Sequence, residues 1–245
     1  AEVERFERAM DCSLQRLSDV DRALDDYTAR ARAAGKLVAL KCGMAYQGTL
    51  DFRNSSYVVA EPIFERVMRG ERCDVRPLTE YLFHRFVQRA REFDLPVQIH
   101  TGYLAGNWQN PNQGDPTPLA AVFRRYKGVR FDLFHAGWPF TEVACSLGKT
   151  LPNVYLDLCW AWAMNPVTME AALDSWLAAV PHNKIFGFGA DTGTPYVVPG
   201  YALQARNGIA RVLEAKIERG QYDLSTAQGV ARRILHENAQ EFYGL

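Results

Sequence analysis

Neither sign of charge is in excess in this sequence of 245 residues, which carries 28 Lys and Arg against 28 Asp and Glu. Proteins that bind nucleic acid or an acidic membrane surface usually carry a basic excess, so neither partner is expected. The sequence also lacks apolar runs of the ~18 to 20 residues that cross a bilayer. Its charged start, AEVERFERAM, has no signal-peptide stretch. We therefore expect a soluble, cytoplasmic protein.

Cysteine is scarce and has no paired spacing, because the five residues stand at positions 12, 42, 73, 145 and 159 without a C-x-x-C motif. An odd number of unpaired cysteines in a chain too long to need disulfide staples indicates a reducing compartment. Hydrophobic residues make up 48% and aromatic residues 12%, which is typical of a globular domain.

Five runs of strand length and β-branched or aromatic character are present, at residues 36–42, 95–100, 129–135, 153–159 and 184–190. Amphipathic stretches between them predict helices, the clearest over residues 77–93. Strands that alternate with helices predict parallel strands buried on both faces, which means an α/β sheet or barrel.

Helices are also expected at both ends of the chain. The first 35 residues predict a helix capped by Ser18 and stopped by Gly35. At the other end, residues 225–243 place apolar side chains on one helical face.

Polar residues stand where the predicted strands end. His100 ends the second strand, His135 ends the third, and Asp191 follows the fifth, while Lys41 lies near the end of the first. The carboxyl ends of parallel strands gather at one rim, so we expect His100, His135 and Asp191 to converge there. A single histidine at a strand end is more often structural, but two imidazoles and a carboxylate form a ligand set suited to zinc or a similar divalent ion.

Other residues near these strand ends are candidates for contact with a small-molecule substrate. The loop at residues 102–118 is longer than the usual two to six residues of such a connection. Tyr46 follows the first strand, and Trp160 and Trp162 follow the fourth. The two tryptophans either line a pocket, which they would border together with the loop, or pack strands against helices.

These segments resemble the amidohydrolase superfamily, specifically its amidohydrolase-2 branch of metal-dependent barrel enzymes. The resemblance is carried, in the order of barrel strands four to eight, by VALKCGMAYQGTLDF, PVQIHTGY, FDLFHAGWPF, LPNVYLDLCW and IFGFGADTG, and by the ending ILHENAQEFYGL. It implies a (β/α)8 TIM-type barrel in which residues 1–245 form a single domain with strands four to eight.

The resemblance also implies roles for the candidate residues. His100, His135 and Asp191 would bind a divalent metal, most simply Zn²⁺ with Mn²⁺ as an alternative, and Asp191 and His135 would take part in catalysis. Lys41, Tyr46, Trp160 and Trp162 are the candidates for substrate binding. The implied activity is hydrolysis of a small amide, ester or lactone through a metal-activated water. Decarboxylation and sugar-acid isomerisation occur in the same branch and stay open.

One departure from the family pattern is clear, because no two of the five histidines form the His-x-His pair that the family places on its first strand. One hypothesis is an upstream segment of roughly three βα units, about 100 residues, that supplies strands one to three. That segment would also bring the missing His-x-His pair. Residues 1–245 alone would then be inactive, would bind metal weakly if at all, and would associate with another fragment or as a homo-oligomer. The other hypothesis is a non-catalytic, metal-free barrel remnant that binds a ligand or a partner chain.

Overall fold

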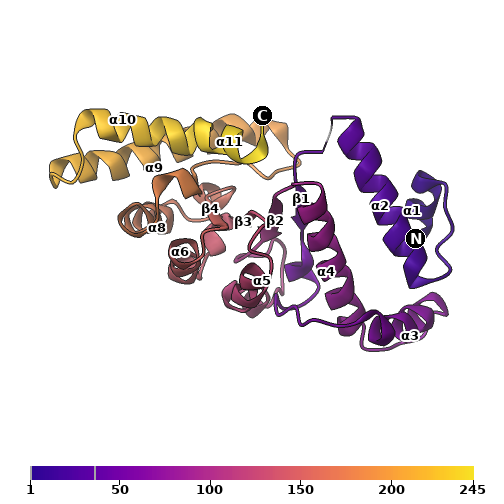
Figure 1. Ribbon diagram of the computed structural model, residues 1–245. Helices are drawn as coiled ribbons and strands as arrows, with labels where there is room; N and C mark the ends of the chain where they lie inside the picture. The colour runs from indigo at the N-terminus through magenta and orange to yellow at the C-terminus, as the bar shows by residue number, and fades with distance from the viewer. Residues whose placement is uncertain (1, 36) are drawn as a thin grey trace. The chain divides into compact units, whose positions relative to one another are not determined.

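The computed structural model of the chain describes residues 2–35 and 37–245 (Figure 1). The chain divides into two compact units, one formed by Ala1–Leu40 and Asp51–Leu95 and the other by Lys41–Leu50 and Pro96–Leu245. The single domain expected over residues 1–245 stays a prediction. Across the described ranges, no helix combines the length and the apolar character that a membrane crossing requires.

The first unit is helical. It contains α1 (Glu2–Met10), α2 (Leu17–Ala33), α3 (Tyr57–Met68) and α4 (Arg76–Glu92). Small and large apolar side chains from three of these helices and the turn before α2 form its buried core, which consists of Leu14, Leu17, Ala23, Ala60, Phe64 and Leu78. The helices predicted over the first 35 residues and over residues 77–93 are thus confirmed.

The start of α2 differs from the prediction, because Ser18 lies inside the helix and Arg16 is the N-cap residue. The Oδ2 atom of Asp19 accepts the backbone N–H groups of Gln15 at 2.9 Å and Arg16 at 2.8 Å. These hydrogen bonds lower the pKa of Asp19. A carboxylate three residues after the N-cap satisfies free backbone donors better than the Ser18 hydroxyl could from within the first turn.

The second unit contains a parallel sheet with strands in sequence order: β1 (Leu40–Cys42), β2 (Val97–His100), β3 (Phe131–Phe134), β4 (Val154–Asp157) and β5 (Ile185–Phe186). The five predicted strands are confirmed, although each is shorter than its apolar run. Lys36, at the start of the first run, lies outside the described residues. This sheet confirms the α/β fold class; its five strands do not close a barrel.

The two faces of this sheet differ in chemistry. In the register of the strands, Ile99 is the partner of Leu133, Leu133 of Leu156, and Leu156 of Ile185, and all four side chains are fully buried. The opposite face carries polar and aromatic side chains, namely Gln98, His100, Asp132, Phe134, Tyr155, Asp157 and Phe186. Because side chains alternate along a strand, one face builds a helix-packed core while the other presents the functional groups.

Helices of the second unit follow the strands, and Figure 1 shows α5, α6 and α8 in sequence along one side of the sheet. These helices are α5 (Ala120–Arg125), α6 (Thr141–Thr150), α7 (Ala161–Met164), α8 (Pro166–Ala179), α9 (Val198–Glu218), α10 (Leu224–Arg232) and α11 (Asn238–Tyr243). The terminal helix predicted over residues 225–243 is confirmed, with a π-helical turn at Arg233–Glu237.

Helix α9 is not predicted by apolar periodicity in the sequence, although it has 21 residues. Pro199 and Gly200 stand in its first turn and Gly208 is buried at its centre, so its apolar pattern is interrupted. Gly208 is required there because a Cβ atom would lie 2.2 Å from the Trp162 ring. Tertiary packing therefore requires glycine at this position, although glycine is unfavourable inside a helix.

The π-helical turn joins the C-terminal helices to the end of β5. The carbonyl of Ile234 accepts the N–H of Gly187 at 2.6 Å, and the Asn238 side chain donates to the carbonyls of His182 at 2.7 Å and Ile185 at 2.9 Å. Since Gly187 bonds to a helix rather than to β4, the strand ends early. The following residues are thereby free to leave the sheet toward Asp191.

Candidate metal centre

Two histidines on neighbouring strand ends face each other at the centre of the site. His100 closes β2, and His135 follows β3 with a left-handed φ of 69°. The Nδ1 atom of His100 lies 3.0 Å from Nε2 of His135. Each ring uses its other nitrogen on a backbone carbonyl, His100 Nε2 at 2.9 Å from Tyr103 and His135 Nδ1 at 2.9 Å from Cys159. Both imidazoles are therefore held in a fixed orientation.

Asp191 completes this group from the loop after β5. Its Oδ2 atom lies 3.3 Å from Nε2 of His135, and the ligand atoms of His100, His135 and Asp191 all lie within 4.8 Å of one another. The convergence predicted from the strand ends is thus present. Asp191 also has a left-handed φ, 40°, and its side chain is 45% exposed, whereas the His135 side chain is fully buried. Strained backbone at such a rim is typical of a functional site.

The surroundings of the two imidazoles keep them neutral. Burial, reinforced by the neighbouring His100 and opposed by the hydrogen bond to Cys159, lowers the pKa of His135 to about 3. Burial likewise lowers the pKa of His100, against the hydrogen bond to Tyr103. Neutral imidazole is the form that binds a metal.

The number of protons on the two rings provides a test of whether a metal fits. Two neutral imidazoles carry two N–H groups, and the carbonyls of Tyr103 and Cys159 accept one each. No proton is left for the contact between His100 Nδ1 and His135 Nε2, so two lone pairs meet there beside the Asp191 carboxylate. A cation held by all three groups resolves this conflict, and histidines that donate their second N–H to a carbonyl are the usual metal ligands.

Three of the four predicted substrate-contact residues lie near the candidate ligands or on the same face of the sheet. The Tyr46 ring lies 4.7 Å from the His100 ring, and its hydroxyl accepts the N–H of Ala105 at 3.1 Å. The Trp160 ring lies 5.5 Å from His135. The Lys41 ammonium lies 3.1 Å from the centre of the Phe134 ring. Lost hydration lowers the pKa of Lys41, and the negative charge of Asp191 opposes this shift.

Trp162 does not belong to this group. Its side chain is buried, its indole N–H donates to the carbonyl of Gly187 at 2.9 Å, and its ring packs on Gly208 of α9. Of the two interpretations that the sequence left open, packing between strand end and helix describes Trp162. The substrate-binding interpretation is corrected because the ring has no free surface and its one donor is already used.

Three further contributors were not singled out from the sequence. Tyr103 and Trp138 each come three residues after a candidate ligand, and their rings lie 5.5 Å apart. Their positions in the PVQIHTGY and FDLFHAGWPF segments could have indicated them. Cys159 contributes a backbone carbonyl to His135, and no side-chain pattern reveals such a role.

A buried carboxylate, Asp132, lies on the same sheet face in β3, three residues before His135. Asp132 is fully buried, accepts a hydrogen bond from the Tyr243 hydroxyl, and has a second oxygen without a partner among the described residues. Burial raises its pKa to about 7, although Tyr243 and Lys41 oppose the shift. Burial also raises the pKa of Asp157 on the neighbouring strand, and the negative charge of Asp132 adds to it.

We expect Asp132→Asn to change how stability depends on pH. An unfolded Asp ionises near pH ~3.9, so between about pH 4 and pH 7 only the folded state keeps the Asp132 proton. This contribution to stability is present at low pH and is lost as the pH rises to about 7. The variant should therefore be more stable than the parent by about 2 to 4 kcal/mol at pH 8, and the difference should shrink toward pH 4.

Urea unfolding of both proteins at several pH values measures this difference. The exposed Asp26→Asn exchange on α2 serves as the control and should leave the pH dependence unchanged. A stability difference for Asp132→Asn that is the same at pH 4.5 and pH 8 would contradict the prediction.

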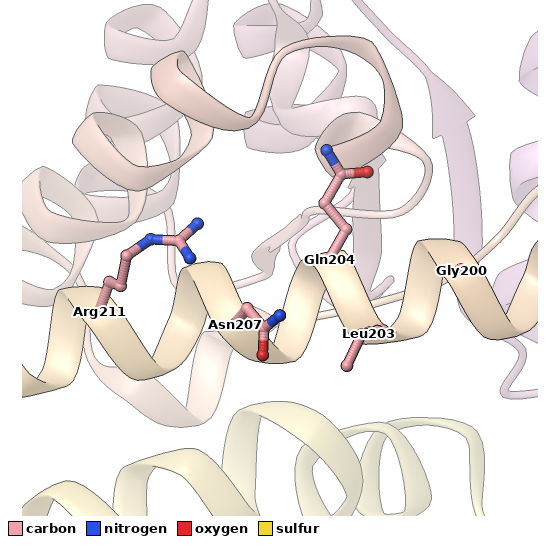
Figure 2. A pocket seen from close by; sticks show the side chains of 5 residues that line it. All are labelled: Gly200, Leu203, Gln204, Asn207 and Arg211. Atoms are coloured by element: carbon pink, nitrogen blue, oxygen red, sulfur yellow. The ribbon is translucent and has the colours of Figure 1, made fainter.

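A groove on α9 is separate from the metal centre. It has a volume of about 300 Å³ and is lined by Gly200, Leu203, Gln204, Asn207 and Arg211. Figure 2 shows Gln204 and Arg211 extending to one side of the helix and Leu203 to the other. Because Arg211 pairs with Glu170 at 2.5 Å, its charge is already neutralised. None of the candidate ligands lines this groove.

The family model for amidohydrolases matches residues 20–245, and the chain belongs to this amidohydrolase-2 family. Among curated proteins, protein fluG of Emericella nidulans is 26% identical over 218 residues. This match covers 85% of the chain but 25% of fluG, so the chain spans a quarter of that relative.

Solved structures show the same fold at low sequence identity. A Lactobacillus casei protein assigned as a metal-dependent hydrolase is 21% identical with a TM-score of 0.82, and the match covers 99% of this chain and 63% of that one. The uronate isomerase of Thermotoga maritima is 14% identical with a TM-score of 0.83, covering 99% and 57%. These likenesses show that the five-stranded parallel sheet and its helices match part of the fold of amidohydrolase-type TIM barrels.

Proposed function

We propose that this protein is a metal-dependent hydrolase that acts on a small amide, ester or lactone. The observation that carries the proposal is the meeting of two imidazole lone pairs and a carboxylate at one strand-end rim, with both second N–H groups bound to carbonyls. Three protein donors with one position left for water or substrate is the composition of catalytic zinc sites. Zn²⁺ is the first candidate and Mn²⁺ the second.

The residues of the chain suggest their own parts in such a reaction. A divalent ion, when bound, supplies Lewis acidity that favours water deprotonation near neutral pH and polarises a substrate carbonyl. Asp191 is exposed enough to meet water, and its carboxylate would accept the proton and return it to the leaving group. His135 has its proton on Nδ1 against Cys159, which favours a ligand role for Nε2 over donation to an oxyanion.

Isomerisation or decarboxylation of a sugar acid is the second candidate, and one observation favours it. Lys41 places an ammonium within electrostatic range of Asp191, and a cation at that position suits a substrate carboxylate. Assays of the same metal-loaded protein on uronates and on neutral amides, esters and lactones separate the two candidates.

The proposal predicts stoichiometric metal binding. After EDTA treatment, calorimetric titration with Zn²⁺ or Mn²⁺ should show one equivalent bound per chain. His100→Ala removes one of the three ligands and should weaken the affinity by at least about 100-fold, more than the loss of an outer-shell partner does. Proton release should accompany binding where a ligand is still protonated.

The control for this titration is His236→Ala, because His236 is an exposed histidine outside the cluster. This variant should bind metal as the parent does. A parent chain that folds but takes up no metal would show that residues 1–245 alone are not a metal-dependent hydrolase. It would favour either the barrel remnant that binds a ligand or a partner, or the upstream segment that completes the site.

A further inference from the structure

A small cavity lies within the loop that follows β2. The loop is closed at its base, where Gly102 N–H donates to the carbonyl of Gly114 at 2.7 Å. Both glycines are required, since a Cβ atom at Gly114 would lie 1.9 Å from the Gly102 carbonyl oxygen and Gly102 has a φ of +74°. The enclosed chain and Pro139 surround a volume of about 260 Å³. The loop therefore folds back on itself and forms a pocket.

This loop cavity borders the metal centre through Tyr103. The Tyr103 carbonyl accepts the hydrogen bond from His100 Nε2 at 2.9 Å, and the Tyr103 ring lines the cavity. The same ring lies 5.7 Å from Trp160, which lies 5.5 Å from His135. A group that occupies the loop cavity would therefore lie beside the substrate atoms that reach the candidate ligands.

The lining of the loop cavity is uncharged and combines apolar with amide side chains. All eight residues that line it in the described part of the chain are neutral; Leu104, Pro111 and Pro139 supply aliphatic surface, and Asn107 and Gln109 supply amides. The one charged residue within positions 102–118 is Asp115, whose Oδ1 atom already accepts two hydrogen bonds from Thr117. A charged ligand group would lose hydration there without gaining a counter-charge.

Trp108 is the unusual member of this lining. The residue is fully exposed, and its φ is 66°, in the left-handed region that a bulky residue rarely adopts. An exposed tryptophan costs hydrophobic free energy and this backbone conformation adds strain. Both costs are offset if a ligand stacks on the ring.

We propose that the loop cavity is the substrate subsite that holds an uncharged aromatic ring, with Trp108 stacked on it and the amides of Asn107 and Gln109 meeting its polar substituents. The proposal rests on the proposed function, because Tyr103 joins the cavity to the candidate ligands. The volume of about 260 Å³ is large enough for one aromatic ring, since a closed cavity of about 150 Å³ holds benzene. The substrate class is then a neutral aromatic amide, ester or lactone.

Benzamide and benzoate are a matched pair of probes, because they share a ring and differ in charge. Calorimetry and tryptophan fluorescence are recorded with the full chain, both treated with EDTA and loaded with Zn²⁺. We expect benzamide to bind in both states and to bind at least tenfold more tightly than benzoate in the EDTA-treated chain. Trp108→Ala should weaken benzamide binding about tenfold.

Tyr196→Ala is the control, because Tyr196 is also a highly exposed aromatic residue, at 90%, and does not line the cavity. It should leave benzamide affinity unchanged. Methyl glucoside, a neutral non-aromatic ring, should bind more weakly than benzamide.

Several outcomes would overturn the subsite. Equal affinity for benzamide and benzoate, tighter binding of methyl glucoside, or a Trp108→Ala variant that binds as the parent does would each do so. Sedimentation that shows a dimer lost in Trp108→Ala would assign the ring to a contact between copies of the chain. Binding of metal without benzamide leaves the hydrolase standing and removes the subsite. Binding of benzamide by a chain that takes up no metal would leave the aromatic site standing and remove the hydrolase.

Discussion

Replacement of Asp191 by Asn is expected to lower kcat/KM of the metal-loaded protein about a thousandfold or more on the substrate that the amide, ester and lactone panel identifies. The exchange keeps the shape of the side chain but removes both a charged metal ligand and the proposed proton acceptor. Loss of general acid–base catalysis alone accounts for about 10²- to 10⁴-fold. Steady-state kinetics at saturating metal measure the effect.

The fold should tolerate this exchange. Asp191 is 45% exposed and has a left-handed φ, a conformation that Asn adopts at least as readily as Asp. The free energy of unfolding should change by no more than about 0.5 kcal/mol. Asp26→Asn on α2 is the control and should keep full activity. An Asp191→Asn variant with unchanged kcat/KM would remove Asp191 from the reaction.

Gly208→Ala is expected to destabilise the protein by about 2 to 3 kcal/mol, the cost typical of overpacking a filled core. A Cβ atom at this position would lie 2.2 Å from the Trp162 ring, which is itself buried and fixed by its hydrogen bond to Gly187. The ring or helix α9 must then shift. Chemical denaturation gives the difference in free energy of unfolding.

Gly229→Ala on α10 is the matched control, because a Cβ atom there meets nothing within 4 Å. In an open helical position the same exchange should stabilise by about 0.5 to 1 kcal/mol. The Gly208 variant combined with Trp162→Leu should lose less stability than the sum of the two single changes, since both act on one contact. Equal effects of the two glycine exchanges would show that Trp162 is not tightly packed.

Parts of the fold that depend on local pattern were predictable. Helix α4 and the terminal helices follow apolar periodicity, and the five strands lie within their apolar runs. The strand lengths were not predictable, because β5 ends where Gly187 bonds to Ile234, which is 47 positions further along the chain. Helix α9 was not predictable for a related reason. Its central residue must be glycine because of the distant Trp162 ring, and not because of the residues next to it in the sequence.

For the site, the sequence by itself determined that two imidazoles and a carboxylate stand at or after the ends of three different strands, and parallel strands then bring His100, His135 and Asp191 to one rim. Only the tertiary structure decided which nitrogens face inward, because the carbonyls of Tyr103 and Cys159 fix the rings. It also separated Trp160, beside His135, from Trp162, buried on Gly208. Residue type and spacing predict which side chains stand at the strand ends. The orientation of the rings and their burial depend on atoms that are distant in the sequence.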